Sequence, residues 1–521
     1  MRLHDQKRPA GVLYLLPWLL ALFFALWGLR GIQNGNIIDT DAARHAMNGA
    51  FLHDLVRDGE FTRPMQYAKA YYGRYPALSL PYHPPLFPLV ESVFFFGFGV
   101  NLVTARILVA LFVALAAVLL YRLIRRTHGS HLLAFLATAT FFWINGSQRV
   151  AADVMLEFPS LALAIAALLF LEQLEPRLTL GRALGFAAFA GAAMWTKQNV
   201  LFFIALPMLY VVLARRWRLL REVPVWAATA AFGIAVAGVI AVQKLSPFTH
   251  NTTWPQTTLP QTVLVNIPYY LQELTEEFGL VATIVVLAGV AFAVFRPRPA
   301  GNALYAAWAI AGLGLVAVLP PRDPRYLFFI YPALAVLGYS LLAELGRRLL
   351  GARRAWAMPA AAAAAWMLLV AQVPHVYLRG PAEAARVVAA AGPERVLYCG
   401  RTNGTFIFSV RSMDGGRHFS VLRGDKLPAE VFAPGAFEAF AHEYGIQQIV
   451  LERNKVERRA WDKLFDSPPQ GLELVREIAL DSSEQNLSGA LRVFRFANPS
   501  PTPKSMVKIR MMSGEELAMG L

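Results

Sequence analysis

Residues 12–30 read VLYLLPWLLALFFALWGLR, an almost entirely apolar run that ends on a basic residue. A run of this length and composition is typical of an α-helix that crosses the hydrocarbon core of a bilayer. It is long for the core of a secretory signal and lacks a clear small-residue cleavage site, so we interpret it as an uncleaved first span. Apolar runs of comparable character recur along most of the chain. The fold class that follows is an α-helical protein with many transmembrane helices.

The composition of the chain agrees with many membrane spans. Of its 521 residues 56% are hydrophobic and only 16% are charged, whereas about a quarter of the residues of a soluble protein are charged. We expect about eleven transmembrane helices or more, because the apolar segments occupy approximately residues 12–30, 100–121, 132–147, 156–171, 183–196, 198–214, 224–243, 279–295, 302–320, 326–344 and 356–373.

Positive charge is concentrated in short loops between these apolar segments. The net charge is +15, and Lys and Arg are favoured in cytoplasmic loops. With the N-terminus inside and eleven spans, the basic loops lie on the cytoplasmic side and the C-terminal part lies on the exoplasmic side. No aromatic and basic binding module accompanies the charge, so we do not expect nucleic acid as a partner. The basic groups are Arg2, Lys7 and Arg8; Arg122, Arg125 and Arg126; Arg177 and Arg182; Arg215, Arg216, Arg218 and Arg221; Arg296 and Arg298; and Arg347, Arg348, Arg353 and Arg354.

The polar stretches of the chain define its expected domains. We expect a membrane module at 1–379, whose first exoplasmic loop occupies about 31–99. Residues 380–497 have the polarity of a soluble domain, in which short runs such as RVLYCG, QQIVLE and LRVFRF are typical of strands and alternate with helical stretches. This alternation predicts a small exoplasmic α/β domain. The polar tail at 498–521 is expected to be flexible.

Acidic residues lie at two exoplasmic ends of the predicted spans. Asp39 and Asp41 directly follow the first span in NIIDTDAARHAM, where Asp41 is either a helix N-cap or a functional acid. Asp153 and Glu157 follow the third span and, four residues apart, share one helix face. Glu157 stands at the start of an apolar run, where an acid is either a solvated helix end or a functional group.

Cations also lie at exoplasmic ends, where charge statistics disfavour them. Lys197, Arg322 and Arg325 are in this position, and a bound phosphate would explain them. Snorkelling to the interface, or an ion pair between Asp323 and a neighbouring Arg, would explain them equally well. His83 lies in the segment PYHPPLFP beside Tyr82. A lone His is more often structural, but the prolines hold this one in a fixed extended segment.

The order of these motifs resembles a known family. D-x-x-R-H-A begins at Asp41, H-P-P-L begins at His83, an acid follows the third span, T-K ends at Lys197, and R-Y with a later proline begins at Arg325. Over about residues 12–345 this series resembles the bacterial relatives of protein O-mannosyltransferases and the aminoarabinose transferases of lipid A. These are membrane glycosyltransferases of the GT-C fold class.

The resemblance implies roles for individual residues. Asp41 matches the first-loop acid that acts as catalytic base, and Asp153 matches the second-loop acid. The positions that face the lipid phosphate or shape the lipid pocket correspond to His83, Lys197, Arg325 and Tyr326, with Arg322 as a further phosphate contact. Many relatives have Asp-Glu where this chain has Asp41 followed by Ala. Auxiliary roles are therefore assigned to Asp39, Glu157 and Tyr82.

The expected function is transfer of a sugar from a polyprenyl-phosphate donor to an exoplasmic acceptor, with inversion and with Asp41 as the general base. The expected location is a bacterial inner membrane with a periplasmic C-terminal domain. Neither a G-x-G-x-x-G segment after a predicted strand nor a P-loop is found, and a membrane-embedded donor would explain the absence of these nucleotide-binding motifs. A divalent cation held by Asp41 and Asp153 stays open. The alternatives are a transporter or flippase for a lipid-linked substrate, which would favour repeats and charges at mid-membrane, and a non-catalytic scaffold.

Overall fold

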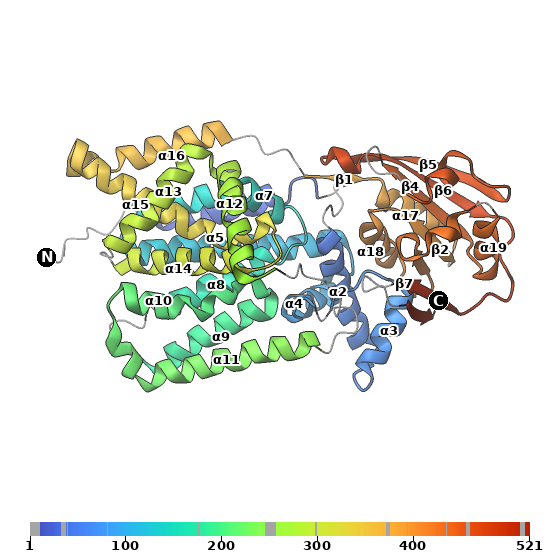
Figure 1. Cartoon of the computed structure of the whole chain (residues 1–521), viewed down its shortest axis with the longest axis horizontal. Coiled ribbons are helices and arrows are strands. Elements are labelled where there is room, and N and C mark those ends of the chain that lie inside the picture. Colours follow the sequence, from blue (N-terminus) through green and yellow to red (C-terminus); the bar gives the residue numbers. More distant parts are fainter. Residues whose placement is uncertain are drawn as a thin grey trace.

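A computed structural model describes residues 11–32, 38, 40–80, 82–173, 178–244, 257–296, 300–370, 376–392, 394–433, 435–454, 459–510 and 516–520. The molecule is elongated, with a helical module at one end and an α/β domain at the other (Figure 1). Helices α2 (Thr40–Asp58), α3 (Pro64–Arg74) and α4 (Leu86–Phe98) lie between these two parts. The residues predicted to carry chemistry belong mainly to this middle region and to the adjoining ends of the bundle.

The helices before the α/β domain follow the apolar pattern of the sequence. They are α1 (Leu16–Gly28), α2 (Thr40–Asp58), α3 (Pro64–Arg74), α4 (Leu86–Phe98), α5 (Leu102–His128), α6 (His131–Trp143), α7 (Asn145–Ala151), α8 (Glu157–Glu172), α9 (Leu180–Thr196), α10 (Leu206–Leu213), α11 (Val223–Lys244), α12 (Leu259–Phe278), α13 (Leu280–Phe295), α14 (Ala300–Val318), α15 (Tyr331–Leu350) and α16 (Ala357–Val370). Two short 3₁₀ segments, η2 (Gln198–Ile204) and η4 (Pro324–Phe329), join some of them near the site.

The central helix α5 illustrates how local sequence sets these boundaries. Asn101 accepts a hydrogen bond from the backbone N–H of Thr104 and so caps the first turn. Gly129 follows the last turn at φ 71°, a left-handed conformation that glycine adopts without a Cβ penalty. Between these ends α5 packs against α1, α6 and α8. It therefore forms the centre of the helical module.

Each predicted apolar segment contains a helix, but the number of membrane spans stays a prediction. Among the described residues, three helices are long and apolar enough to cross a membrane, namely Leu102–His128, Val223–Lys244 and Gly301–Val318. A fourth span results if α12 and α13, bent by 116° at their junction, are counted as one. Shorter apolar helices are present at Leu16–Gly28, Leu86–Phe98, His131–Trp143 and Gln198–Leu213.

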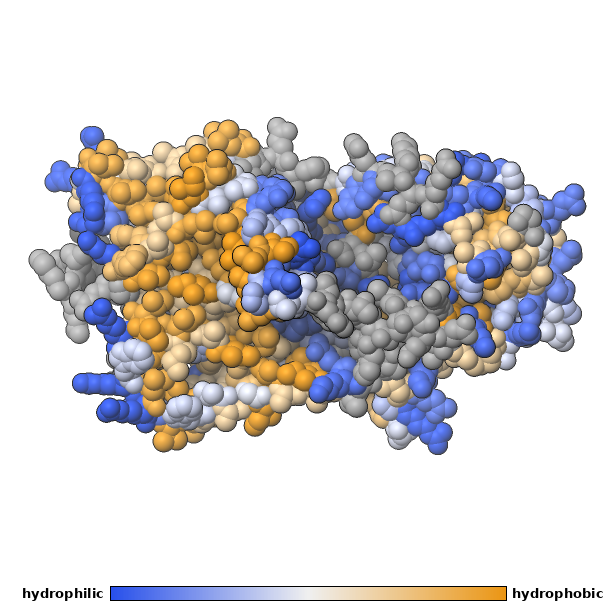
Figure 2. Space-filling view, in the orientation of Figure 1, coloured by the Kyte–Doolittle hydropathy of each residue, from blue (hydrophilic) through white to orange (hydrophobic). Residues whose placement is uncertain are grey.

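A hydrophobic surface covers much of the helical module (Figure 2). Large apolar side chains are exposed on α1, α11 and α13, for example Leu26, Ile234 and Val281. At the start of α1, the rings of Tyr14 and Trp18 lie under guanidinium groups from the last turns of α5. Exposed apolar groups bordered by aromatic and basic side chains are typical of a surface that meets lipid.

The C-terminal region forms the predicted α/β domain. Its six-stranded sheet has the order β1 (Leu378–Arg379), β5 (Leu472–Ser482), β6 (Gly489–Phe496), β4 (Gln448–Asn454), β2 (Arg395–Cys399) and β3 (Ser420–Arg423). β2 pairs in parallel with β3 and β4, and β6 pairs antiparallel with β4 and β5. The helices are α17 (Pro381–Ala390), α18 (Asn403–Met413), α19 (Ala436–Glu443) and α20 (Asp462–Asp466). The three predicted strands RVLYCG, QQIVLE and LRVFRF coincide with β2, β4 and β6.

The prediction of a flexible tail at 498–521 is wrong for the described part of that segment. Strands β7 (Met506–Arg510) and β8 (Glu516–Gly520) pair antiparallel, and β8 packs against α3. Val507 and Ile509 alternate with polar residues and are buried. Burial of every second side chain is the pattern of a strand with one buried face. The pattern is short and is surrounded by Pro, Ser and Lys residues, so it is not evident from the sequence.

Candidate active site

Asp41 lies in the first turn of α2, where two arginines contact its carboxylate. Arg325 Nη2 is 3.2 Å from Asp41 Oδ2, and Arg44 Nη1 is 3.2 Å from Asp41 Oδ1. A quarter of the Asp41 side chain is exposed. The fold thus joins an acid from the first loop to a cation that lies 284 residues later in the chain.

Arg325 is held in place by its neighbour Asp323, the N-cap residue of η4. The Asp323 carboxylate accepts a hydrogen bond from the backbone N–H of Arg325 at 2.9 Å. It also accepts from Arg325 Nη2 at 2.6 Å and from Nε at 2.9 Å. The ion pair considered from the sequence is therefore present. Arg325 bridges Asp323 and Asp41, and a third anion could replace either partner.

Asp153 lies in the turn between α7 and α8 and is buried. Its two oxygens accept hydrogen bonds from the backbone N–H groups of Val154, at 2.8 Å, and Ile38, at 3.2 Å. Ile38 precedes Asp41 by three residues. Asp153 therefore fixes the segment that leads into α2 and the first-turn acid.

A cavity of about 450 Å³ lies beside these groups. Asp153, Arg325 and Arg322 line it, together with the acid Glu277 from α12 and Glu484 from the C-terminal domain. The guanidinium of Arg322 lies 5.7 Å from the ring centroid of Tyr269. The cavity therefore combines cations and carboxylates from the membrane module with one carboxylate from the α/β domain.

His83 contacts a histidine that the sequence analysis did not assign. The rings of His83 and His45 are 4.6 Å apart and nearly perpendicular, and both side chains are buried. His45 lies one turn after Asp41 on α2, inside the D-x-x-R-H-A motif that carried the resemblance. Burial lowers the pKa of His83 to about 3 and also places the pKa of His45 well below its ordinary value. Both imidazoles are therefore neutral near pH 7.

The charges around Asp41 determine its protonation. Burial raises the pKa of this carboxyl, whereas the charges of His45 and His83 when protonated, and the permanent charges of Arg325 and Arg44, lower it below its ordinary value. Because both imidazoles are neutral near pH 7, the two arginines keep Asp41 ionised there. Arg44, like His45, is a motif residue to which the sequence analysis gave no role.

Lys197 and Glu157 form a buried ion pair with each other. Lys197 Nζ is 2.5 Å from Glu157 Oε1, and the side chains are 7% and 0% exposed. The interpretation of Glu157 as a solvated helix end is therefore wrong, because the first turn of α8 is covered by α9 and its neighbours. Glu157 Oε2 is buried without a hydrogen-bond partner among the described residues. Lys197 is thus a cation whose charge is already compensated in this structure.

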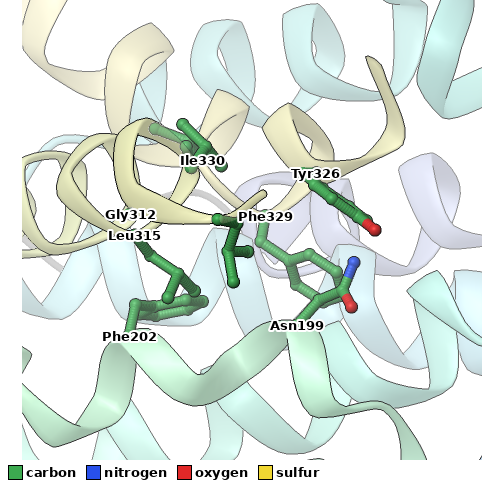
Figure 3. A pocket seen from close by; sticks show the side chains of 9 residues that line it. Asn199, Phe202, Gly312, Leu315, Tyr326, Phe329 and Ile330 are labelled. Carbon is green, nitrogen blue, oxygen red and sulfur yellow. The ribbon is translucent and has the colours of Figure 1, made fainter. Parts of the chain in front are cut away.

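Tyr326 lies at the edge of a narrow, largely apolar crevice (Figure 3). Its hydroxyl lies on the same side of the crevice as the amide of Asn199, and Phe202, Leu315 and Phe329 form the apolar part. Asn199 Nδ2 is buried and finds no hydrogen-bond partner in the described structure. Polar atoms therefore border one side of a groove that is otherwise hydrocarbon.

Tyr82 lies beside the histidines and is half-buried. Its ring centroid is 4.9 Å from that of His83, and its carbonyl accepts a hydrogen bond of 2.8 Å from Gln243 Nε2 at the end of α11. Tyr82 therefore connects the first-loop segment to the membrane module. Asp39, the other auxiliary candidate near this position, lies outside the described residues.

The described residues contain no group of three or more His, Cys, Asp or Glu side chains that could hold a metal ion. Asp41 is engaged by two arginines, and Asp153 accepts backbone N–H groups. The chemistry that this arrangement offers is that of an ionised acid and a shared guanidinium at the edge of a polar cavity.

Known proteins share this arrangement of elements. Residues 82–241 match the family model described as dolichyl-phosphate-mannose-protein mannosyltransferase. The crystal structure of ArnT from Cupriavidus metallidurans in the apo state is similar with a TM-score of 0.60 and 15% identity, over 92% of this chain and 97% of that chain. The same protein bound to undecaprenyl phosphate gives a TM-score of 0.58 and 16% identity, over 93% and 98% of the two chains. The chain has the fold of ArnT. Among curated protein sequences, none matches significantly.

The structural likeness to ArnT extends beyond the segment that carried the sequence motifs. Those motifs cover about residues 12–345, whereas the ArnT structure covers 92% of this chain. The matched part is too large to be the helical module alone, so the C-terminal domain belongs to the shared architecture. The segment that matches the mannosyltransferase family model begins at Tyr82 and includes His83, Asp153 and Lys197.

Proposed function

We propose that the protein transfers a glycosyl group from a polyprenyl-phosphate donor to an acceptor on the exoplasmic side of the membrane. The single observation that carries this proposal is the contact of Arg325 with Asp41 at the edge of the polar cavity. A general base and a cation suited to a phosphate leaving group must meet at one place in such a reaction. These two groups come from remote parts of the chain and meet there.

The donor phosphate would bind at Arg325, because a guanidinium can offer two parallel N–H groups to phosphate oxygens. The solved ArnT from C. metallidurans holds undecaprenyl phosphate, which supports a lipid phosphate as the ligand class. Arg322 lines the same cavity and would add a second cation. Lys197 and neutral His83 lie deeper and contribute through the buried network that surrounds Asp41. The crevice beside Tyr326 is apolar but has a volume of only about 10 Å³, room for a single water molecule, so it would have to open to admit the first prenyl units.

Binding of the phosphate would also activate the base. Asp41 is a weak base while Arg325 contacts it, because the positive charge holds its pKa low. A phosphate that draws Arg325 away leaves Asp41 more basic and free to face the cavity. Asp41 then removes a proton from the acceptor hydroxyl or amine as that group attacks the anomeric carbon. The bond from this carbon to the phosphate oxygen breaks, the lipid phosphate leaves with the bonding electrons, and attack from the opposite face inverts the anomeric centre.

The acceptor would occupy the cavity between the bundle and the C-terminal domain. Its lining carries Asp153, Glu277 and Glu484 as well as Arg149 and Arg322. Groups of both charges can hydrogen-bond a hydroxyl-rich ligand as donors and as acceptors. Asp153 would act chiefly by holding the segment before Asp41, through its contact with Ile38.

The test is a turnover assay on the full chain in lipid nanodiscs. A panel of labelled undecaprenyl-phosphate monosaccharides is supplied with hydroxyl and amine acceptors, and release of undecaprenyl phosphate is measured. We expect Asp41→Asn to lower the rate by about 10²–10⁴-fold, the range for a positioned base. The matched control is Asp466→Asn, at a half-exposed surface ion pair with Arg453, which we expect to keep the wild-type rate.

Two outcomes would overturn the proposal. The base assignment is wrong if Asp41→Asn keeps more than about a tenth of the wild-type rate. With the full chain reconstituted in sealed proteoliposomes, a lipid transporter would move the labelled donor across the bilayer intact, so translocation without release of undecaprenyl phosphate would favour that alternative function.

A further inference from the structure

The C-terminal domain is joined to α2 by a buried ion pair. Arg411 of α18 places Nη2 2.5 Å from Asp54 Oδ1 and 2.7 Å from Oδ2, and its Nε lies 2.9 Å from Oδ2. The two side chains are 3% and 0% exposed. The hydroxyl of Tyr71 donates to the same carboxylate at 2.8 Å. This fork-to-fork geometry is the strongest and most directional form of an Arg–carboxylate contact.

A second set of contacts holds the segment that follows α3. Asp414, just after α18, accepts a hydrogen bond of 2.5 Å from the hydroxyl of Tyr75. The same carboxylate accepts the backbone N–H groups of His418 and Phe419. Arg423 of β3 donates to the carbonyl of Pro76 at 3.1 Å. The α/β domain therefore forms polar contacts with both α2 and the segment that leads to His83.

Arg417 adds a strained residue to this junction. It pairs with Asp58 at the end of α2, and its Nη1 is 2.8 Å from the Tyr67 hydroxyl. Its backbone lies at φ 59°, a left-handed conformation that a non-glycine residue seldom adopts. Such a conformation persists only where surrounding contacts over-determine it. The junction between the domain and α2 is therefore held by several specific ion pairs and hydrogen bonds.

The two elements that the α/β domain contacts, α2 and the segment that leads to His83, are also those that carry the proposed site. Helix α2 runs without a break from Thr40 to Asp58, so Asp41 and Asp54 lie on one rod about 20 Å apart at 1.5 Å per residue. Asn48, midway along it, donates to Ser79 Oγ at 2.9 Å and accepts from Ser79 N at 3.0 Å. This pair of bonds ties the chain that leads to His83 to the same helix. A shift of α2 at Asp54 would move both Asp41 and His83.

We propose that Arg411 is a positioning residue and that the C-terminal domain forms part of the framework of the active site. The effect on transfer rests on the function proposed above, whereas the effect on α2 does not. Arg411 acts through Asp54 and the rigid helix, because it contacts neither the cavity nor Asp41. Misplacement of a reacting group by about 1 Å can cost about 100-fold in rate, so a change at this distance from the chemistry still has a large consequence.

The experiment compares Arg411→Met, Arg411→Lys and Asp54→Asn with the wild-type full chain in nanodiscs. Hydrogen exchange is measured over residues 41–52 and 403–413, and kcat and KM are measured for the donor. We expect Arg411→Met to speed exchange over 41–52 by about tenfold or more and to lower kcat by about 10–100-fold, while KM for the donor stays nearly constant. Arg411→Lys keeps the charge and should recover part of kcat.

The matched control is Arg492→Met, which breaks the Arg492–Glu477 pair between the neighbouring strands β5 and β6 of the same domain. We expect no change in exchange over 41–52 and none in kcat. The inference is overturned if Arg411→Met leaves exchange over 41–52 unchanged, or raises KM and leaves kcat at the wild-type value. If Arg411→Met does not fold, the same measurements on Asp54→Asn test the positioning role. This variant weakens the ion pair but keeps the shape of the side chain and an acceptor for Tyr71. Absence of turnover in the wild type would count against the proposed function alone, since exchange over 41–52 still tests the positioning role.

Discussion

At the scale of single residues, the contact of Arg325 with Asp41 makes a prediction about pH. A depressed pKa in the folded state means that the ionised form of Asp41 persists as pH falls below about 4, the ordinary value for Asp. Arg325→Met removes one of the two permanent charges that cause this depression. We expect the acid limb of the pH profile of kcat/KM, which reports the free enzyme, to move to higher pH. An acid limb in the same position would show that Arg325 does not set the charge of Asp41.

Sequence reasoning found several of these residues but not their partners. Asp41, Asp153 and Arg325 stand out because charged residues at the ends of apolar runs are uncommon. That Arg325 is shared between Asp41 and Asp323, and that Lys197 is already paired with Glu157, depends on side-chain directions that no spacing rule encodes. His45 carried a usable signal, since it stands one helical turn after Asp41 and would share its face.

At the scale of elements, the Lys197–Glu157 pair joins the end of α9 to the start of α8. Removing one partner leaves an uncompensated buried charge, which costs about 3–5 kcal/mol. We expect Lys197→Met to lower the midpoint of thermal unfolding strongly, and the double variant Lys197→Met with Glu157→Gln to recover most of the loss. Arg348→Met, at an exposed pair with Glu344, should cost about 0–1 kcal/mol. If Lys197→Met proved as mild as Arg348→Met, the pair would not be buried as described.

Uninterrupted apolar runs were enough to predict helices, whereas α4 was not predicted as a helix of its own. It lies in the segment 31–99 that was assigned to the first exoplasmic loop, and Glu91 and Ser92 interrupt its apolar stretch. The structure buries both residues, and Glu91 lies against Gly49 of α2, where an added Cβ would come within 2.2 Å of a carboxylate oxygen. Glycine at position 49 thus lets a polar residue enter an interface between helices, a fit that hydropathy alone does not predict.

At the scale of the whole molecule, the C-terminal strand β8 makes a prediction about α3. A Cβ on Gly73 would lie 2.2 Å from the carbonyl oxygen of Gly520. We expect Gly73→Ala to destabilise the full chain, measured as a lower thermal midpoint. In a chain that ends at residue 505 the same change should be neutral or stabilising by up to about 1 kcal/mol, the helix-propensity gain of Ala over Gly. Equal effects in the two chains would mean that β8 does not dock on α3.

The association of the two parts of the molecule is the feature least accessible from sequence. Asp54 and Arg411 are 357 residues apart, and each resembles an ordinary solvated charge in its own helix. Alternation of strands and helices was enough to predict the α/β domain, and the domain matched expectation in its three principal strands. Its attachment to α2 depends on complementarity between distant surfaces, which periodicity does not record.

The most direct measurement is a structure of the full chain in nanodiscs with undecaprenyl phosphate added. We expect the phosphate to lie within about 3 Å of the Arg325 guanidinium, Asp41 to have lost its contact with Arg325, and the Asp41 carboxylate to face the cavity lined by Asp153. A phosphate bound elsewhere, with the contact between Arg325 and Asp41 unchanged, would contradict the proposal that the donor and the general base compete for one cation.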